Sequence, residues 1–170
     1  MHFKLEHTLD STIDNVEKLM FDKEYYEFLK ANHSGVRDIE VIEQTFGQEA
    51  IRRQVKYTPK PIIEKVGPKK IPVEAMIFME HSTYDRGRHR LSFRNVPAMR
   101  LVRERMTNEG TISFVQEGAA TRRVVEGELV VKFPILGAIA ERIIFSQARK
   151  LLEEEVACFK RYIVEARKAG

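Results

Sequence analysis

The chain has 170 residues, of which 43% are hydrophobic and 32% are charged, and its formal net charge is +4. These values are typical of a soluble globular protein and predict one domain, residues 1–170, with a core of its own. The hydrophobic runs are too short or too interrupted for a membrane span, and the N-terminal residues lack the apolar segment of a signal peptide. We therefore expect a cytoplasmic protein, and the small positive charge gives only a slight preference for anionic partners.

The first 35 residues predict a strand followed by two short helices. Phe3, Leu5, His7 and Leu9 alternate with polar residues, which is typical of a half-buried strand. Ser11 is the expected N-cap of the first helix. The second helix is expected to end within residues 32–35.

Residues 37–133 predict strands that are joined mostly by short turns. Asp85, Arg86 and Gly87 form a hairpin turn signal, and residues 108–110 are expected to bend or split a long strand. The predicted strands are residues 37–45, 50–58, 73–84, 88–94, 100–116 and 122–133.

The C-terminal part of the chain predicts one long amphipathic helix over residues 135–166. Pro134 precedes it, and a proline suits a helix start. Steps of three and four place the apolar residues on one broad face, which needs a surface to lie on. These residues are Leu136, Ile139, Ala140, Ile143, Ile144, Ala148, Leu151, Leu152, Val156, Phe159 and Ile163.

This order of elements predicts an α+β protein. Consecutive strands with short connections form an antiparallel sheet. A curved sheet of six or seven strands wrapped around one long helix is a helix-grip fold, and it leaves a space between sheet and helix. The two short helices are expected to close one end of that space.

Two short motifs resemble the START-like superfamily, also called the SRPBCC or birch-pollen-allergen-like superfamily. The first is Glu6-His7-Thr8-Leu9-Asp10 before Ser11, and the second is the run of residues 131–137, Val-Lys-Phe-Pro-Ile-Leu-Gly, ahead of the helix with its acidic patch at residues 153–155. The resemblance covers nearly the whole chain and is strongest to a bacterial branch without a settled function. Members of the superfamily include lipid carriers, hormone receptors, polyketide cyclases and chaperone activators, so the resemblance implies a fold and not one function.

From this fold we expect binding or transport of a hydrophobic small molecule or lipid in an internal cavity. A polyketide cyclase or aromatase-like enzyme and a non-catalytic protein-interaction module remain open alternatives. Strand alternation and the helix stripe predict the cavity lining, although a register slip of one residue would reverse every strand assignment. The expected ligand-binding residues are Phe78, His81, Leu91, Phe93, Phe114, Leu129, Val131, Ile139, Ile143 and Gln147.

Residues with catalytic potential are scattered. Cys158 is the only cysteine, so no internal disulfide can form, and its place on the helix indicates a buried small hydrophobe. His7 and His81 are interpreted as structural, although His81 beside Tyr84 would suit a cyclase. Gln147 falls inside the apolar stripe and needs either a local hydrogen bond or a polar group of a ligand. We predict no catalytic nucleophile, no metal site and no cofactor.

Residues 56–72 interrupt the strand pattern with four prolines, five lysines and several aliphatic residues. A long insertion of this kind is often functional. Residues 62–66 are expected to form a short helical turn, and the segment is either a solvated loop that caps the core or a weak contact with an anionic membrane. The expected membrane contacts are Ile62, Ile63, Lys65, Lys69 and Lys70.

Arginine is frequent between residues 86 and 105, and Arg88, Arg90 and Arg94 are expected to share the outer face of the sheet. Such a patch suits phosphate, but no stacking aromatic residues are interleaved with the arginines, and glutamates are available to pair with them. A salt-bridged outer face is the favoured interpretation, and no nucleic-acid partner is expected.

Overall fold

The computed structural model describes residues 1–61, 65–66, 69–132 and 137–169. Within them, seven strands form one antiparallel sheet in the order β1-β9-β8-β7-β6-β3-β2. The elements in chain order are β1 (His2–Leu9), α1 (Ile13–Met20), α2 (Lys23–Asn32), β2 (Val36–Phe46), β3 (Ala50–Pro59), β4 (Lys65–Val66), β5 (Lys69–Lys70), a 3-10 helix (Val73–Met76), β6 (Phe78–Asp85), β7 (Arg90–Pro97), α3 (Arg100–Arg103), β8 (Met106–Glu117), β9 (Ala120–Val131) and α4 (Gly137–Ala169).

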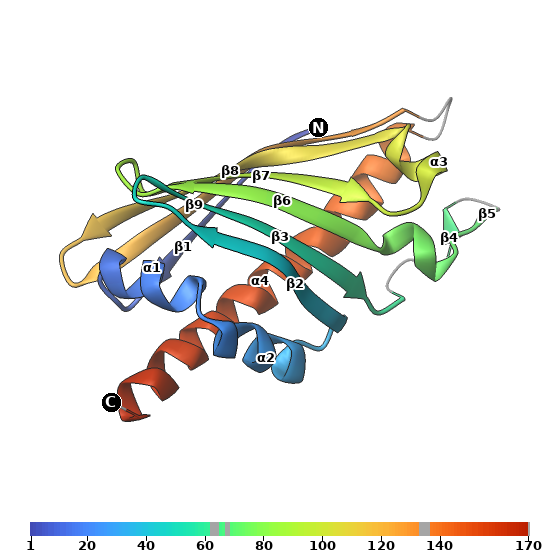
Figure 1. The fold of residues 1–170 in the computed structure, drawn as a ribbon. Helices are drawn as coiled ribbons and strands as arrows, with labels where there is room; N and C mark the ends of the chain where they lie inside the picture. Colours follow the sequence, from blue (N-terminus) through green and yellow to red (C-terminus); the bar gives the residue numbers. More distant parts are fainter. Residues whose placement is uncertain (62–64, 67–68, 133–136, 170) are drawn as a thin grey trace.

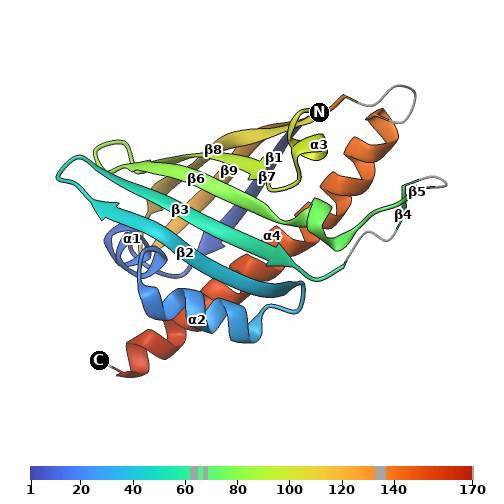
Figure 2. The same cartoon turned by 45° about the vertical axis from the view of Figure 1, so that its right-hand side comes forward.

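The sheet curves around α4, as the helix-grip prediction requires (Figure 1). Turning the molecule shows α4 running obliquely across the concave side, with α2 beside it (Figure 2). The concave side is called the inner face below, and the other side is the outer face. The end of the sheet next to α1 is called the α1 end, and the opposite end, with the β4–β5 hairpin, α3 and the start of α4, is called the β4–β5 end.

Helix α4 is continuous over 33 residues, with no break near Ser146. Its stripe buries Val156, Phe159 and Ile163 in the core, which confirms the predicted orientation. The expected start at residues 134–135 lies outside the described residues. Glu141 fixes the first turns, because its Oε1 accepts a hydrogen bond from the Val131 N–H at 2.8 Å.

A local prediction in the N-terminal part of the chain is corrected. The N-cap of α1 is Thr12 and not Ser11. Ser11 is buried instead, where its carbonyl accepts a hydrogen bond from the Thr121 hydroxyl at 2.7 Å and its Oγ accepts one from the Asn15 amide at 2.7 Å. These two bonds hold the chain between β1 and α1 in one place.

Three predicted segments of the middle of the chain also differ from the structure. Residues 73–76 form a 3-10 helix after Pro72, so β6 begins only at Phe78. Residues 100–103 form the short helix α3, whereas residues 108–110 continue β8 without a break because strands pair with them on both sides. Residues 65–66 are paired in the β4–β5 hairpin rather than helical, and residues 62–64 lie outside the described part.

Candidate functional site

The inner face of the sheet carries most of the residues that were expected to line a cavity. Leu91, Phe114, Leu129 and Val131 are buried there, and Phe78 is half-buried. Phe93 is also half-buried and packs against the buried core. The alternation of these strands therefore brings the six side chains to one face, although most of them are part of the packed core.

Two residues expected at the cavity lie elsewhere. His81 is exposed on the outer face, because alternation along β6 turns its neighbours Glu80 and Ser82 inward. Ile139 is 51% exposed in the first turn of α4. Ile143 and Gln147 are half-buried on α4, and no described residue forms a hydrogen bond with the Gln147 amide.

The buried apolar residues form two separate clusters, one toward each end of the interior. The larger cluster joins α1, α2 and the C-terminal half of α4 to the strands, and includes Leu29, Tyr84 and Phe159. The smaller cluster, at the β4–β5 end, contains Leu129, Val131 and Ala140. Phe78, the first residue of β6, faces inward at the β4–β5 end, where it is half-buried and belongs to neither cluster.

Tyr57 lies opposite Phe78 on the inner face, as its cross-strand partner on β3. Burial raises the pKa of its phenol well above the usual value, yet the side chain keeps part of its accessible surface. Its ring stacks on Phe78 at 5.1 Å between ring centroids, and no described residue forms a hydrogen bond with its hydroxyl. Tyr57 also packs against the larger cluster, so its ring connects that cluster to Phe78.

A charged group lies beside Tyr57 on the inner face. Arg53 is 8% exposed and donates from Nη2 to Glu80 Oε1 at 3.0 Å and from Nε to Ser82 Oγ at 3.3 Å. A further nitrogen donates to the Tyr26 hydroxyl, and the guanidinium lies over the Phe21 ring at 5.2 Å. Buried charges are stable only when they are paired in this way.

A second polar group connects β1 and β9 to α4. Arg123 Nη1 lies 3.3 Å from His7 Nδ1, and its Nη2 lies 3.7 Å from Glu155 Oε2. Because a guanidinium only donates, His7 Nδ1 accepts and the ring proton lies on Nε2, 3.4 Å from Glu153 Oε2. Burial lowers the pKa of His7, and the nearby Arg123 charge adds to the effect. Burial and the Arg123 charge together favour the neutral imidazole of His7, while the Glu153 carboxylate acts in the opposite direction on its pKa.

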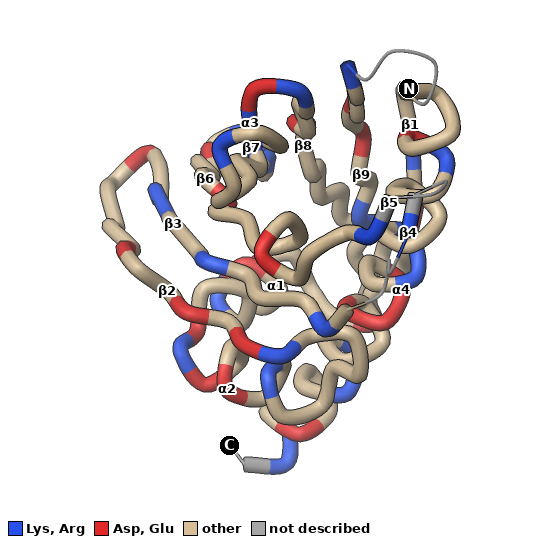
Figure 3. Tube along the Cα trace, turned by 90° about the vertical axis from the view of Figure 1, so that its right-hand side faces the viewer, with Lys and Arg blue, Asp and Glu red and all other residues tan. Residues whose placement is uncertain are grey.

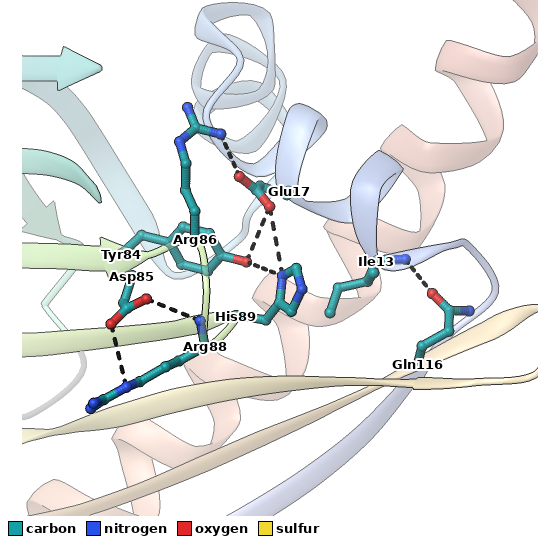
Figure 4. Close-up of polar contacts among 8 residues, drawn as sticks. All are labelled: Ile13, Glu17, Tyr84, Asp85, Arg86, Arg88, His89 and Gln116. Carbon is teal, nitrogen blue, oxygen red and sulfur yellow. Dashed lines mark hydrogen bonds and ion pairs between the residues drawn. The ribbon is translucent and has the colours of Figure 1, made fainter. Parts of the chain in front are cut away.

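The α1 end is closed by polar contacts between α1 and the strands (Figure 4). Glu17 accepts from Arg86 Nη1 at 2.6 Å and from the Tyr84 hydroxyl at 3.4 Å. Gln116 Oε1 accepts from the Ile13 N–H at 2.7 Å, which satisfies one of the free donors at the start of α1. Burial, followed by the Glu17 charge, raises the pKa of Tyr84. The group therefore fastens α1 to the strands.

The β4–β5 end carries basic and exposed apolar residues. Figure 3 looks onto this end and shows lysine or arginine on β4, β5 and α3. Lys65 and Lys70 are exposed, as is Leu101 at 56%. Of the expected membrane contacts, Ile62 and Ile63 lie outside the described residues, and the backbone of Lys69 pairs in the hairpin.

The outer face of the sheet is polar and ion-paired. Arg94 lies 3.8 Å from Glu109, and Lys4 lies 3.5 Å from Glu126. Depressions of about 490 and 640 Å³ on this face are lined mostly by charged and hydroxyl side chains and are open to solvent. They lack the apolar lining of a site for a hydrophobic molecule. Among the described residues, no group of His, Cys, Asp and Glu side chains has the arrangement of a metal site.

In the described part of the chain, no helix is long and apolar enough to cross a membrane. Cys158 is buried in the core, as expected.

Sequence reasoning missed the polar residues of the inner face. Arg53 lies two residues from both Ile51 and Val55, so alternation alone places it inward. Asn95 and Asn108 also face inward, directly opposite each other on β7 and β8. The signal was present in the period of the strands, but neither Arg53 nor Asn95 was assigned to a face, and residues 108–110 were expected to bend or split the strand.

A family model with the description "Protein of unknown function (DUF2505)" matches residues 4–163. No curated protein matches the sequence.

Solved structures are similar along almost the whole chain. A protein from Thermus thermophilus, TTHA0849, has a TM-score of 0.70 at 19% identity, over 98% of this chain and 99% of the other. The Zhui aromatase/cyclase from Streptomyces sp. R1128 has a TM-score of 0.67 at 12% identity, over 96% and 93%. A START superfamily protein from Mycobacterium smegmatis has a TM-score of 0.57 at 12% identity, over 97% and 98%. These similarities confirm the START-like, helix-grip fold.

Proposed function

The chain belongs to the DUF2505 family, and from the geometry of its interior we propose that it binds or transports a hydrophobic small molecule or lipid between the sheet and α4. In this proposal residues 1–170 act as one START-like domain in the cytoplasm. The observation that carries it is the stacked pair of Tyr57 and Phe78 on the inner face, both of which are half-buried and keep part of their surface accessible.

Binding follows from the hydrophobic effect. Phe78 and Phe93 on the inner face and Ile143 on α4 are half-buried, so each keeps accessible apolar surface in the proposed binding region. A ligand that enters this region removes its own apolar surface and theirs from water, at about 25 cal/mol per Å². A few polar groups then orient the ligand, as in other small-molecule sites.

Entry is proposed at the β4–β5 end, where the buried apolar cluster is the smaller of the two. Exposed Lys65 and Lys70, together with Lys69, Ile62 and Ile63, form the proposed weak contact with an anionic membrane. Leu101 and Ile139 add exposed apolar surface at the same end.

Native mass spectrometry of gently purified protein tests the proposal. We expect an additional mass that is released on denaturation, and binding of apolar probes by the emptied protein. Replacing half-buried Ala148 by phenylalanine is expected to fill the interior and weaken binding, whereas the same change at exposed Ala138 is the matched control. If the wild type carries no ligand and binds no apolar probe, the binding function is overturned and the interaction module takes its place.

One observation favours a second candidate, a polyketide cyclase or aromatase-like enzyme. The buried Arg53–Glu80 pair beside the Tyr26 hydroxyl places charged and proton-bearing groups in an apolar interior, which is common at active sites. Turnover of a polyketide-like substrate by the wild type, lost in Tyr26→Phe, would support this candidate. Binding of that substrate without turnover supports the carrier.

A further inference from the structure

Two asparagines, called the amide pair below, lie side by side on the inner face toward the β4–β5 end. Asn95 on β7 and Asn108 on β8 are direct cross-strand partners, with Glu80 opposite Asn95 and Leu129 opposite Asn108. Side chains at such positions share a face and lie about 5 Å apart at Cβ. The row therefore places two neutral amides side by side on the inner face, between Glu80 and Leu129.

Neither amide is satisfied by the protein. The Oδ1 atoms of Asn95 and Asn108 are buried and have no hydrogen-bond partner. In the described chain, no hydrogen bond joins either amide nitrogen to another residue. Buried polar groups are almost always paired, and an unpaired one is unfavourable.

Neighbouring groups of the row cannot supply the missing donor. Glu80 is an acceptor already held by Arg53 at 3.0 Å, and Leu129 has no polar side-chain atom. Phe93, two residues before Asn95 on the same face, lies over Gly110, where an added Cβ would be 2.9 Å from its Cζ. The amide pair is thus bordered by an ion pair on one side and by apolar surface on the others.

We propose that Asn95 and Asn108 anchor the hydroxyl group of an apolar alcohol or phenol, an inference that rests on the proposed binding function. A hydroxyl donates to one Oδ1 and accepts from the amide nitrogen of the neighbouring asparagine, so a single group serves both side chains. A carboxylate or ketone cannot donate and would leave both oxygens unpaired. A carboxylate would also bring a second negative charge toward Glu80.

A matched pair of probes separates this inference from the proposed function. 2-Naphthol and 2-methylnaphthalene have nearly the same shape and differ in the hydroxyl, and the chain has no tryptophan to overlap their fluorescence. We expect the wild type to bind 2-naphthol about tenfold more tightly, the value of one good hydrogen bond. Equal affinities overturn the hydroxyl inference alone, whereas no binding of either probe overturns the binding function as well.

Variants test whether the preference for 2-naphthol over 2-methylnaphthalene depends on Asn95 and Asn108. Asn108→Leu keeps the size of the side chain and is expected to bind both probes equally, with Asn108→Ser as a second variant if the first does not fold. Asn32→Leu, at an exposed position of α2, is the control and should keep the preference. A preference for 2-naphthol that survives in the folded position-108 variant overturns the role of the pair.

Discussion

The two ends of the interior are built differently. At the α1 end, Glu17 and Gln116 fasten α1 to the strands, and Leu29 and Tyr84 are almost completely buried. At the β4–β5 end, the buried cluster is small, and Leu101 is 56% exposed. This contrast is consistent with the proposed entry of a ligand at the β4–β5 end, since regions that open for ligands are drawn from the less stable parts of a protein.

The largest expected effect tests how much the Arg53–Glu80 ion pair of the inner face contributes to stability. Arg53→Met leaves Glu80 buried without its partner, and we expect the free energy of unfolding to fall by about 3–5 kcal/mol. Replacing Glu80 by methionine in the same protein should restore most of the loss, because no charge is then left unpaired. Urea denaturation of the single and double variants measures both values. A double variant as unstable as Arg53→Met would show that the pair acts through packing and not charge.

The next prediction compares the ends directly. Leu29→Ala creates a cavity in the larger cluster and is expected to lower the free energy of unfolding by about 2–5 kcal/mol. Leu101→Ala removes exposed surface and should change it by less than about 0.5 kcal/mol. Thermal or urea unfolding gives both numbers. Similar losses at the two positions would contradict the distinction between the ends.

The difference between the two ends could be predicted only in part from the sequence. The apolar stripe predicted α4, and alternation predicted β1, β3 and β9, because these elements bury one face against a single partner surface. Residues 73–76 were wrongly predicted as strand because Val73, Ala75 and Met76 make the segment apolar on both faces. In the structure these residues form a 3-10 helix that follows Pro72. The sequence therefore predicted the long helix and the strands better than the segments that connect them.

The polar side chains of the inner face were harder to predict than the helix and the strands, and the physical reason is different. Apolar positions identify the inner face, but Arg53 and Asn108 are stable there only through partners on other strands or outside the protein. Those partners depend on cross-strand register, which a single sequence does not fix. His81 was misplaced for the same reason, since Phe78 and Met79 made both faces of the strand look apolar.

A smaller effect concerns the surface of the β4–β5 end. The double replacement Lys65→Gln and Lys70→Gln should weaken binding to anionic vesicles about tenfold at low salt, because each lysine near such a surface contributes about 1 kcal/mol before screening. Lys18→Gln with Lys23→Gln makes the same charge change at the α1 end and should have little effect. Vesicle sedimentation of the wild type and the two double variants measures the difference. Equal binding by both double variants would remove the membrane contact from this end.

The smallest expected effect concerns the pH dependence of stability at His7, which contacts Arg123 on the inner face. Burial lowers the pKa of the folded residue below the unfolded value of about 6.5. As pH falls below about 6.5, the unfolded chain therefore takes up a proton that folded His7 does not, and stability is lost until the folded pKa is passed. The loss is about 1.4 kcal/mol for each unit of lowered pKa. His7→Gln keeps an acceptor for Arg123 but does not titrate, so its stability should fall less than that of the wild type between about pH 7.5 and 5.5. Urea denaturation across this range measures the difference, and parallel curves would show that the Glu153 carboxylate offsets burial at this site.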